Sequence, residues 1–187
     1  MPEKSGEHFK SVEEILETQM RAGNISLILD SYDDIFSDFD PRGYSERALS
    51  DDFLIECKKA ARDKGHKLEL RLMIPKHLRN LKEELKIRQR LKSHFKKHAE
   101  EKHKEILEMK REGAIWFAIG TVLMLVSAFF YGRTDFFFRL LEVMIVPAAW
   151  FMFWEGLEKI FISPRNNEPD YTFYKKMANC QIYFFSY

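Results

Sequence analysis

The second half of the chain contains two apolar stretches separated by a short polar turn. Residues 114–131 (AIWFAIGTVLMLVSAFFY) have no charged side chain, and residues 136–154 have only Arg139 and Glu142. A helix needs about 20 mostly apolar residues to cross the hydrocarbon core of a bilayer. The turn between the stretches, residues 132–135 (GRTD), is only four residues long. We therefore predict a two-helix transmembrane hairpin over residues 113–160, with a buried pair of core helices in a soluble protein as the alternative.

Basic residues next to the two stretches predict how the hairpin is oriented. Those on the N-terminal side are Lys96, Lys97, Lys102, Lys104, Lys110 and Arg111, and those that follow are Lys159, Arg165, Lys175 and Lys176. The turn offers only Arg133. Cytoplasmic loops near membrane spans carry the excess of Lys and Arg, so both termini are predicted to be cytoplasmic. The two cysteines, Cys57 and Cys180, fit a reducing compartment and imply neither a disulfide nor a metal site.

Residues 1–76 predict a small cytoplasmic α/β domain. A capping box at residues 11–14 starts a helix that ends near residue 23. A buried strand over residues 25–30 (ISLILD), a helix over 51–64 capped by Ser50, and a half-buried strand over 67–75 (KLELRLMIP) follow. Strand, helix and strand of these lengths predict a βαβ unit with parallel strands and a right-handed crossover.

The C-terminal tail, residues 161–187, supplies a third strand within residues 171–187. Ile182, Phe184 and Ser186 alternate there with tyrosine, phenylalanine and glutamine. Because the hairpin returns the chain to the cytoplasm, this strand is predicted to join the sheet, giving an α+β membrane protein. The alternatives are a free tail and a strand that pairs with a neighbouring subunit.

Residues 77–112 contain no Gly or Pro and predict a long basic stalk helix that leads into the first span. Its predicted apolar stripe consists of Leu78, Leu81, Leu85, Leu91 and Phe95 and resumes at Ile106 and Met109, and the helices of several copies would pack side by side. Its basic residues predict a site for an anionic nucleotide or oligonucleotide, because such a cluster attracts phosphates electrostatically. The residues of this site are Arg88, Arg90, Lys92, His94, Lys96 and Lys97. The alternative is a solvated helix face with ion pairs such as Glu84–Arg88.

The charges of the second span predict a pore. Charged side chains at membrane depth usually face a bundle interior or a water-filled path, and rings of them build selectivity elements. At 100° per residue one helix face carries Arg139, Glu142, Val146, Ala149 and Phe153, which we predict to line the pore. The alternative is an Arg–Glu clamp that only fixes helix packing.

Two further patterns predict chemistry less directly. The acidic loop 30–42 (DSYDDIFSDFDPR) offers Asp30, Asp33, Asp34, Asp38 and Asp40 as oxygen ligands for a hard cation. Its alternative is an interface loop whose carboxylates bond local amides while Phe36 and Phe39 pack inward. Arg88 and His94 have the spacing used by HEPN ribonucleases, but those are all-helical, and no nucleophile with a paired base accompanies them. We expect no catalytic residue, no metal and no cofactor.

A small cytoplasmic α/β module, a basic stalk and a two-span hairpin together resemble membrane effectors of bacterial anti-phage defence, with Hailong-type (HalB-like) channels as the nearest family. The segment ISLILDSYDDIFSDFDPRGYSERALSDDFL, residues 25–54, looks like a signature of such proteins. The resemblance implies a homo-oligomer in the bacterial inner membrane, toxicity when activated, and a nucleic-acid ligand made by a partner nucleotidyltransferase. It carries no catalytic residue with it.

The resulting prediction is a ligand-gated, homo-oligomeric ion channel. One alternative is a membrane-tethered adaptor without conductance that recruits a soluble partner protein through the acidic loop and a sheet edge. The other is a membrane-anchored HEPN-like ribonuclease.

Overall fold

The computed structural model describes residues 25–62, 68–133 and 135–187. The helix expected from residue 11 lies outside this range. The described chain forms two compact units: one comprises the residues up to Ala99 together with Phe173–Tyr187, and the other comprises Glu100–Thr172.

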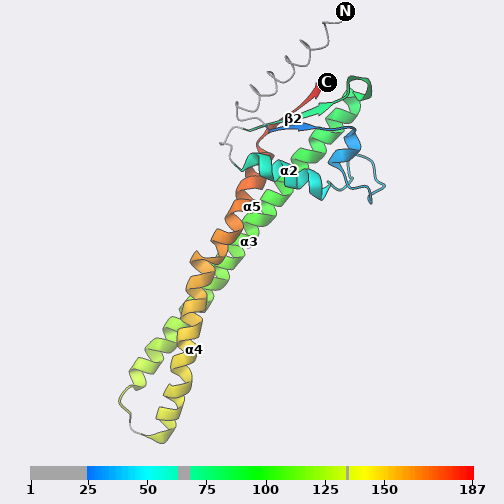
Figure 1. Cartoon of the computed structure of the whole chain (residues 1–187). Coiled ribbons are helices and arrows are strands. Elements are labelled where there is room, and N and C mark those ends of the chain that lie inside the picture. The colour runs from blue at the N-terminus through cyan, green and yellow to red at the C-terminus, as the bar shows by residue number, and fades with distance from the viewer. Residues whose placement is uncertain (1–24, 63–67, 134) are drawn as a thin grey trace, which may run out of the picture. The chain divides into compact units, whose positions relative to one another are not determined.

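The first unit is built on a three-stranded parallel sheet in the order β1-β2-β3 (Figure 1). The strands are β1 (Ile25–Ile28), β2 (Glu69–Ile74) and β3 (Gln181–Ser186). Leu70 in the central strand lies opposite Ile25 on one side and Ile182 on the other. The prediction that the C-terminal tail adds a third strand is confirmed.

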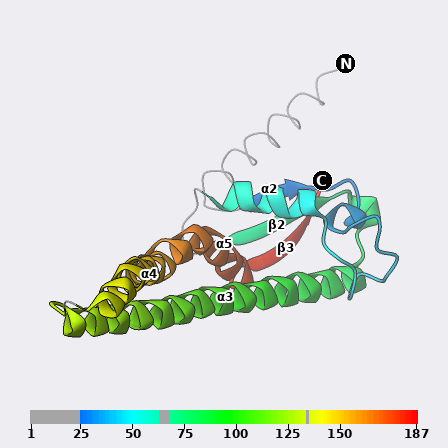
Figure 2. The ribbon, with the colours of Figure 1, turned by 90° about the horizontal axis from the view of Figure 1, so that it is seen from below.

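Among the described residues, helices cover one face of this sheet and leave the other face open. Leu70, Leu72 and Ile74 on the covered face are completely buried, whereas Tyr183 and Phe185 on the open face remain 40% and 41% exposed. The helices pack on the covered face (Figures 1 and 2). They contribute Phe53 and Cys57 from α2 (Asp51–Ala61), Ile87, Leu91 and Phe95 from α3 (Leu81–Phe130), and Phe173 and Met177 from α5 (Ser163–Ala178).

Helix α2 lies between β1 and β2 in the sequence and ends at Ala61, earlier than predicted. Ser50 occupies the N-cap as predicted, but its side chain makes no capping hydrogen bond. The short 3-10 helix η1 (Tyr32–Ile35) follows β1 in the acidic loop.

Helix α3 begins at Leu81, so the prediction that it starts at His77 is wrong. Lys76–Leu78 form a separate 3-10 turn, η2, and Arg79 has an extended backbone that interrupts the helix. Asn80 then acts as the N-cap, since its Oδ1 accepts a hydrogen bond from the Lys82 amide at 3.0 Å. From Leu81 the helix runs for 50 residues without a break.

The first half of the apolar stripe predicted on this helix is not part of the chain's own core. Leu81 is 72% exposed, and Leu78 and Leu85 are exposed as well. The buried face instead follows Glu84, Ile87, Leu91 and Phe95, with the spacing of three and four residues that keeps side chains on one side of a helix. Leu81 and Leu85 lie about 80° and 120° away from Leu91 around the axis, on its flank.

The tail is helical where a strand was expected to begin. Residues 171–178 belong to α5, and the strand starts only at Gln181. Phe173 and Met177, four residues apart, place one helical face of α5 in the core, which explains why this part of the tail does not continue the strand.

The second unit contains the end of α3, the whole of α4 (Phe136–Phe161) and the start of α5. Gly132, with φ of 91°, makes the turn between α3 and α4. Both helices are long and apolar enough to cross a bilayer. Helix α4 continues through Pro147.

Candidate functional site

Three glycines bring α3 and α4 into backbone contact. Gly113 and Gly120 lie on α3, and Gly156 lies on α4. A Cβ atom on Gly120 would lie 2.6 Å from the Phe153 nitrogen and 2.9 Å from the Ala149 oxygen, too close for any side chain. Small residues permit this kind of close helix packing in membranes.

This contact accounts for two of the five predicted pore-lining residues. Ala149 is completely buried, and the Phe153 ring packs against the Phe117 ring with centroids 4.8 Å apart. In the hairpin both therefore serve the packing of α3 against α4.

The other three lie nearer the turn. Arg139 and Val146 are exposed and Glu142 is half-buried. Within the described residues neither Arg139 nor Glu142 forms an ion pair, so the proposed Arg–Glu clamp is not made within one chain. Two charges of opposite sign on the apolar hairpin thus lack an ion-pair partner within the part of the chain that the structure describes.

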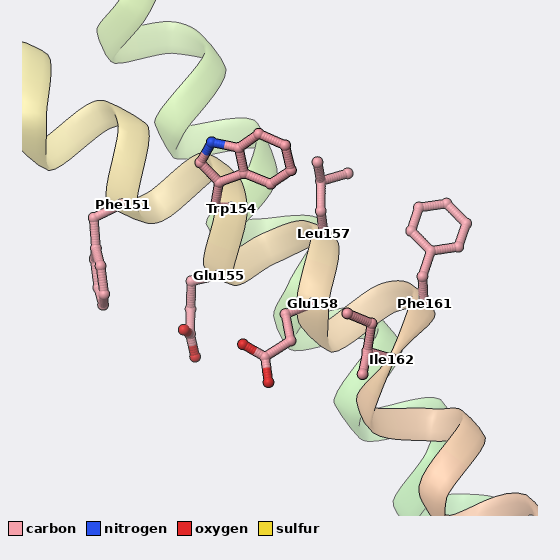
Figure 3. A pocket seen from close by; sticks show the side chains of 7 residues that line it. All are labelled: Phe151, Trp154, Glu155, Leu157, Glu158, Phe161 and Ile162. Atoms are coloured by element: carbon pink, nitrogen blue, oxygen red, sulfur yellow. The ribbon is translucent and has the colours of Figure 1, made fainter.

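Two carboxylates line a pocket at the other end of α4. The pocket has a volume of about 610 Å³, and its walls are Phe151, Trp154, Glu155, Leu157, Glu158, Phe161 and Ile162. Figure 3 shows Glu155 and Glu158 pointing to the same side of the helix. Glu155 lies 3.9 Å from Lys159, whereas Glu158 has no ion-pair partner in the part of the chain that the structure describes. Six of these residues belong to α4 and Ile162 directly follows it, so the pocket is a groove on the surface of one helix.

The six basic residues predicted as a ligand site do not form one cluster. At 100° per residue, Arg88, Lys92 and Lys96 lie on one side of the buried Leu91, and Arg90, His94 and Lys97 lie on the other. Arg88 and His94, the pair considered for ribonuclease chemistry, are thus on opposite flanks of α3.

His94 carries no charge at neutral pH. Burial, together with the positive neighbours His98, Arg90 and Lys97, lowers the pKa of His94 from 6.5 to about 4. Its ring lies 4.2 Å from that of His98, and its buried Nε2 has no hydrogen-bond partner among the described residues. A neutral imidazole adds no electrostatic attraction for an anion, so His94 does not contribute positive charge to the predicted ligand site.

The flank that carries Arg90 continues into a polar pocket that the sequence did not reveal. The pocket has a volume of about 430 Å³, and its lining includes Asp33, Arg42, Tyr44, Arg47, Glu83 and Lys86. Arg90 donates from Nε to the Arg47 carbonyl oxygen at 3.0 Å, which joins α3 to the loop before α2. Three cations therefore face one cavity together with Asp33 and Glu83, and each of the three is ion-paired with a carboxylate.

A buried carboxylate anchors the start of α3 and was also missed. Glu84 is 3% exposed, accepts a bidentate pair of hydrogen bonds from Arg79 at 2.9 and 3.0 Å, and accepts another from the Tyr32 hydroxyl at 3.1 Å. Although burial opposes ionisation, these hydrogen bonds and the Arg79 charge lower the pKa of Glu84. Its spacing from Ile87 and Leu91 was the signal that could have placed it on the buried face.

The acidic loop uses its carboxylates locally. Asp34 accepts from the backbone amides of Asp30 and Ser31, and Asp40 accepts from Arg42 and from the Ala48 amide. Asp33 pairs with Arg47. No group of three or more metal-ligating side chains gathers among the described residues. Phe36 packs inward as the interface-loop alternative expected, but Phe39 is 98% exposed, so that part of the alternative is wrong.

Comparison with models of protein families, with curated proteins and with solved structures finds no match for this chain.

Proposed function

We propose that this chain is the subunit of a homo-oligomeric ion channel in the bacterial inner membrane. An anionic nucleotide or oligonucleotide would gate it from the cytoplasmic side, and it would act in anti-phage defence. The observation that carries the membrane assignment is the exposure of the hairpin. In the most apolar 18-residue segment of each of its two long helices, only 11% and 6% of the residues are buried. A pair of core helices in a soluble protein would be mostly buried, so lipid is the better solvent for these side chains.

The sheet supports a double crossing. Strand β2 precedes the hairpin, β3 follows it, and the two are hydrogen-bonded neighbours. The segments on either side of the hairpin must then lie on the same side of the bilayer. The excess of Lys and Arg beside the apolar stretches favours the cytoplasm as that side.

The unpaired charges support an oligomer with a polar path. Arg139 and Glu142 are costly at membrane depth unless another group or water reaches them. Neither has an ion-pair partner within the described part of its own chain, so neighbouring copies are the natural source of one. We therefore assign the pore to Arg139, Glu142 and Val146, and exclude Ala149 and Phe153 because they lie in the contact with α3.

The polar pocket beside Arg90 supports an anionic ligand. Guanidinium groups bind phosphate in bidentate fashion, and Arg42, Arg47 and Lys86 all line this cavity. A bound phosphate would take the place of their present carboxylate partners Asp40, Asp33 and Glu83. Ligand binding would open the channel only if the open and closed states differed in affinity for the ligand.

Ion currents in planar bilayers test the channel. Wild-type protein would be recorded with and without a mixture of short oligoribonucleotides, beside the double variant Arg139→Leu/Glu142→Leu. The matched control is Lys104→Leu/Glu108→Leu, which removes an exposed pair of opposite charges outside the apolar stretches. We expect altered conductance or ion selectivity in the first variant and wild-type currents in the control. Unchanged currents in the first variant would exclude the pore assignment.

The adaptor is the second candidate, and the open face of the sheet favours it. Ile28, Tyr183 and Phe185 are exposed there, and Phe39 projects from the acidic loop. These are surfaces for a soluble partner protein. An assembled protein that carries no current under any condition, yet binds a cytoplasmic protein, would support this function instead.

A further inference from the structure

A mixed apolar and basic pocket within residues 100–172 has no role in the channel proposed above. It lies between α3 and the junction of α4 with α5 and has a volume of about 380 Å³. Its lining residues are His103, Ile106, Leu107, Lys110, Ile160, Phe161, Pro164, Arg165, Glu168 and Tyr171.

The pocket lies close to the end of the apolar part of the hairpin. Lys110 precedes the first uncharged stretch by four residues, or about 6 Å along a helix. A Cβ atom on Gly113, three residues further along α3, would contact the Gly156 oxygen and the Lys159 and Ile160 side chains, so this level of α3 faces the end of α4.

Two tryptophans mark the same level. Trp154 precedes this end of α4 by two turns, and Trp116 has the Lys159 ammonium 5.7 Å from its ring centroid. Tryptophan is enriched where membrane meets water. If the hairpin is inserted as proposed, the pocket therefore lies at the headgroup layer of the cytoplasmic leaflet.

The cations of this pocket are available to a ligand. Lys159, nearby on α4, is engaged by Glu112 at 3.4 Å and Glu155 at 3.9 Å. By contrast, Lys110 and Arg165 are exposed and have no ion-pair partner among the residues that the structure describes. Glu168 is the single acid in the lining, so the pocket keeps an excess of positive charge.

The apolar residues give the pocket a second character. Leu107 and Phe161 are more than half exposed, although they lie next to these charges. An apolar wall beside two cations suits a molecule that combines a phosphate with a hydrocarbon chain. The ring of His103 stacks on Tyr171, with centroids 5.3 Å apart, and forms the wall furthest from the apolar stretch.

We propose that this pocket binds the headgroup of an anionic phospholipid, with Lys110 and Arg165 contacting the phosphate and Leu107 and Phe161 contacting the first part of an acyl chain. The proposal rests on insertion of the hairpin in a membrane and is independent of ion conduction. Each cation near an anionic membrane surface strengthens binding several-fold, so removing both should weaken binding roughly tenfold or more.

Quenching of tryptophan fluorescence tests the proposal on the full chain in nanodiscs. The discs contain a neutral phosphatidylcholine background and small amounts of phosphatidylglycerol with brominated acyl chains. A parallel series uses brominated phosphatidylcholine. We expect quenching at lower concentrations of the brominated phosphatidylglycerol, and loss of this roughly tenfold preference in Lys110→Gln/Arg165→Gln.

Two control variants make the outcome specific. Lys92→Gln/Lys104→Gln removes the same charge elsewhere on α3 and should keep the preference. Lys110→Arg/Arg165→Lys keeps the charges and should keep it as well. Loss of the preference in the first control would mean that total charge, and not the pocket, attracts the lipid, which would overturn the proposal.

The remaining outcomes separate this proposal from the one on which it rests. Equal quenching by both brominated lipids would leave insertion intact and overturn the lipid site. No quenching by either lipid would overturn insertion itself. Displacement of phosphatidylglycerol by millimolar inorganic phosphate would show that the pocket binds free phosphate and would overturn the choice of a lipid.

Discussion

At the scale of single residues, the first unit depends on a carboxylate in its interior. Glu84 holds Arg79 and Tyr32 together where the chain enters α3, and the Tyr32 hydroxyl in turn accepts from the Asn80 amide at 2.9 Å. A buried charge is costly unless its partners are complete. Glu84 is the only charged side chain classed as buried among the described residues, and its partners are in place.

We expect Glu84→Gln to destabilise the first unit by about 1–3 kcal/mol, because the buried group that accepts hydrogen bonds from Arg79 and Tyr32 loses its charge. The folded pKa of Glu84 is lower than its ordinary value of 4.5, so its stabilisation is complete above that value and is lost as the pH falls further. The difference between wild type and variant should therefore shrink in acid. Urea unfolding at several pH values measures this. Glu83→Gln, which removes an ion pair with the half-exposed Lys86, is the control, and equal effects of the two variants would contradict the prediction.

His94 predicts a loss of stability on acidification in a higher pH range. Its pKa is about 4 in the folded state and 6.5 ordinarily, so between these values the unfolded chain binds more protons and stability falls as the pH is lowered. We expect His94→Gln to make thermal stability less dependent on pH between about 6.5 and 4. Circular dichroism melts at successive pH values check this, with the exposed His77→Gln as the control. A slope as steep in His94→Gln as in wild type would show that His94 is not responsible.

At the scale of helices and strands, the hairpin is held by backbone approach at glycine. There is no room for a Cβ atom at Gly113, Gly120 or Gly156. At Gly43, in the loop before α2, no atom would lie within 4 Å of an added Cβ. Close helix packing through small residues gives the hairpin dispersion contacts that do not depend on excluding water.

We expect Gly120→Val to separate α3 from α4 locally and to destabilise the hairpin by about 1–3 kcal/mol, the usual cost of overpacking. Thermal stability in detergent, followed by size-exclusion chromatography of the heated protein, measures this. Gly43→Val is the matched control and should behave as wild type. A Gly120→Val protein as heat-resistant as the control would argue against the packing described.

The three strands and the two apolar helices were predictable because their signals are local. Alternation with a period of two identified β2 and β3, and an uncharged run of sufficient length identified the end of α3. The side of α3 that is buried depends on which elements cover it. The sequence alone therefore pointed to Leu81 and Leu85, whereas the structure buries Glu84 and Ile87. Residues 171–178 were misassigned for the same reason, since the core recruits Phe173 and Met177 on a helical face.

The candidate sites were less predictable than the fold. The pocket lined by Arg42, Arg47 and Lys86 is formed by a loop and by a helix about forty residues later in the sequence. A pattern within either segment alone therefore could not predict it. The predicted pore face rests only on the angular positions of its residues around α4. The same positions are equally compatible with a contact with α3, and Ala149 lies in that contact, opposite Gly120.

At the scale of the whole molecule, the sheet is made from segments on both sides of the hairpin. We expect a chain shortened to end at Ala178, without β3, to lose the protease resistance of the first unit, because Leu70 and Leu72 lose a neighbouring strand on the buried face. The hairpin should remain resistant in detergent, since its own contacts lie within residues 100–172. Limited proteolysis with mass spectrometry checks both parts. Ser186→Ala, at the exposed end of β3, is the control, and a first unit equally resistant with and without β3 would contradict the role given to this strand.

The late position of β3 also sets an order for biosynthesis. The ribosome makes β1, α2 and β2 first, then both apolar helices, and releases β3 only afterwards. Until then the central strand has one open edge, and an open edge is a template for pairing with another nascent chain. The first unit can therefore become complete only in chains whose two apolar helices have already been synthesised.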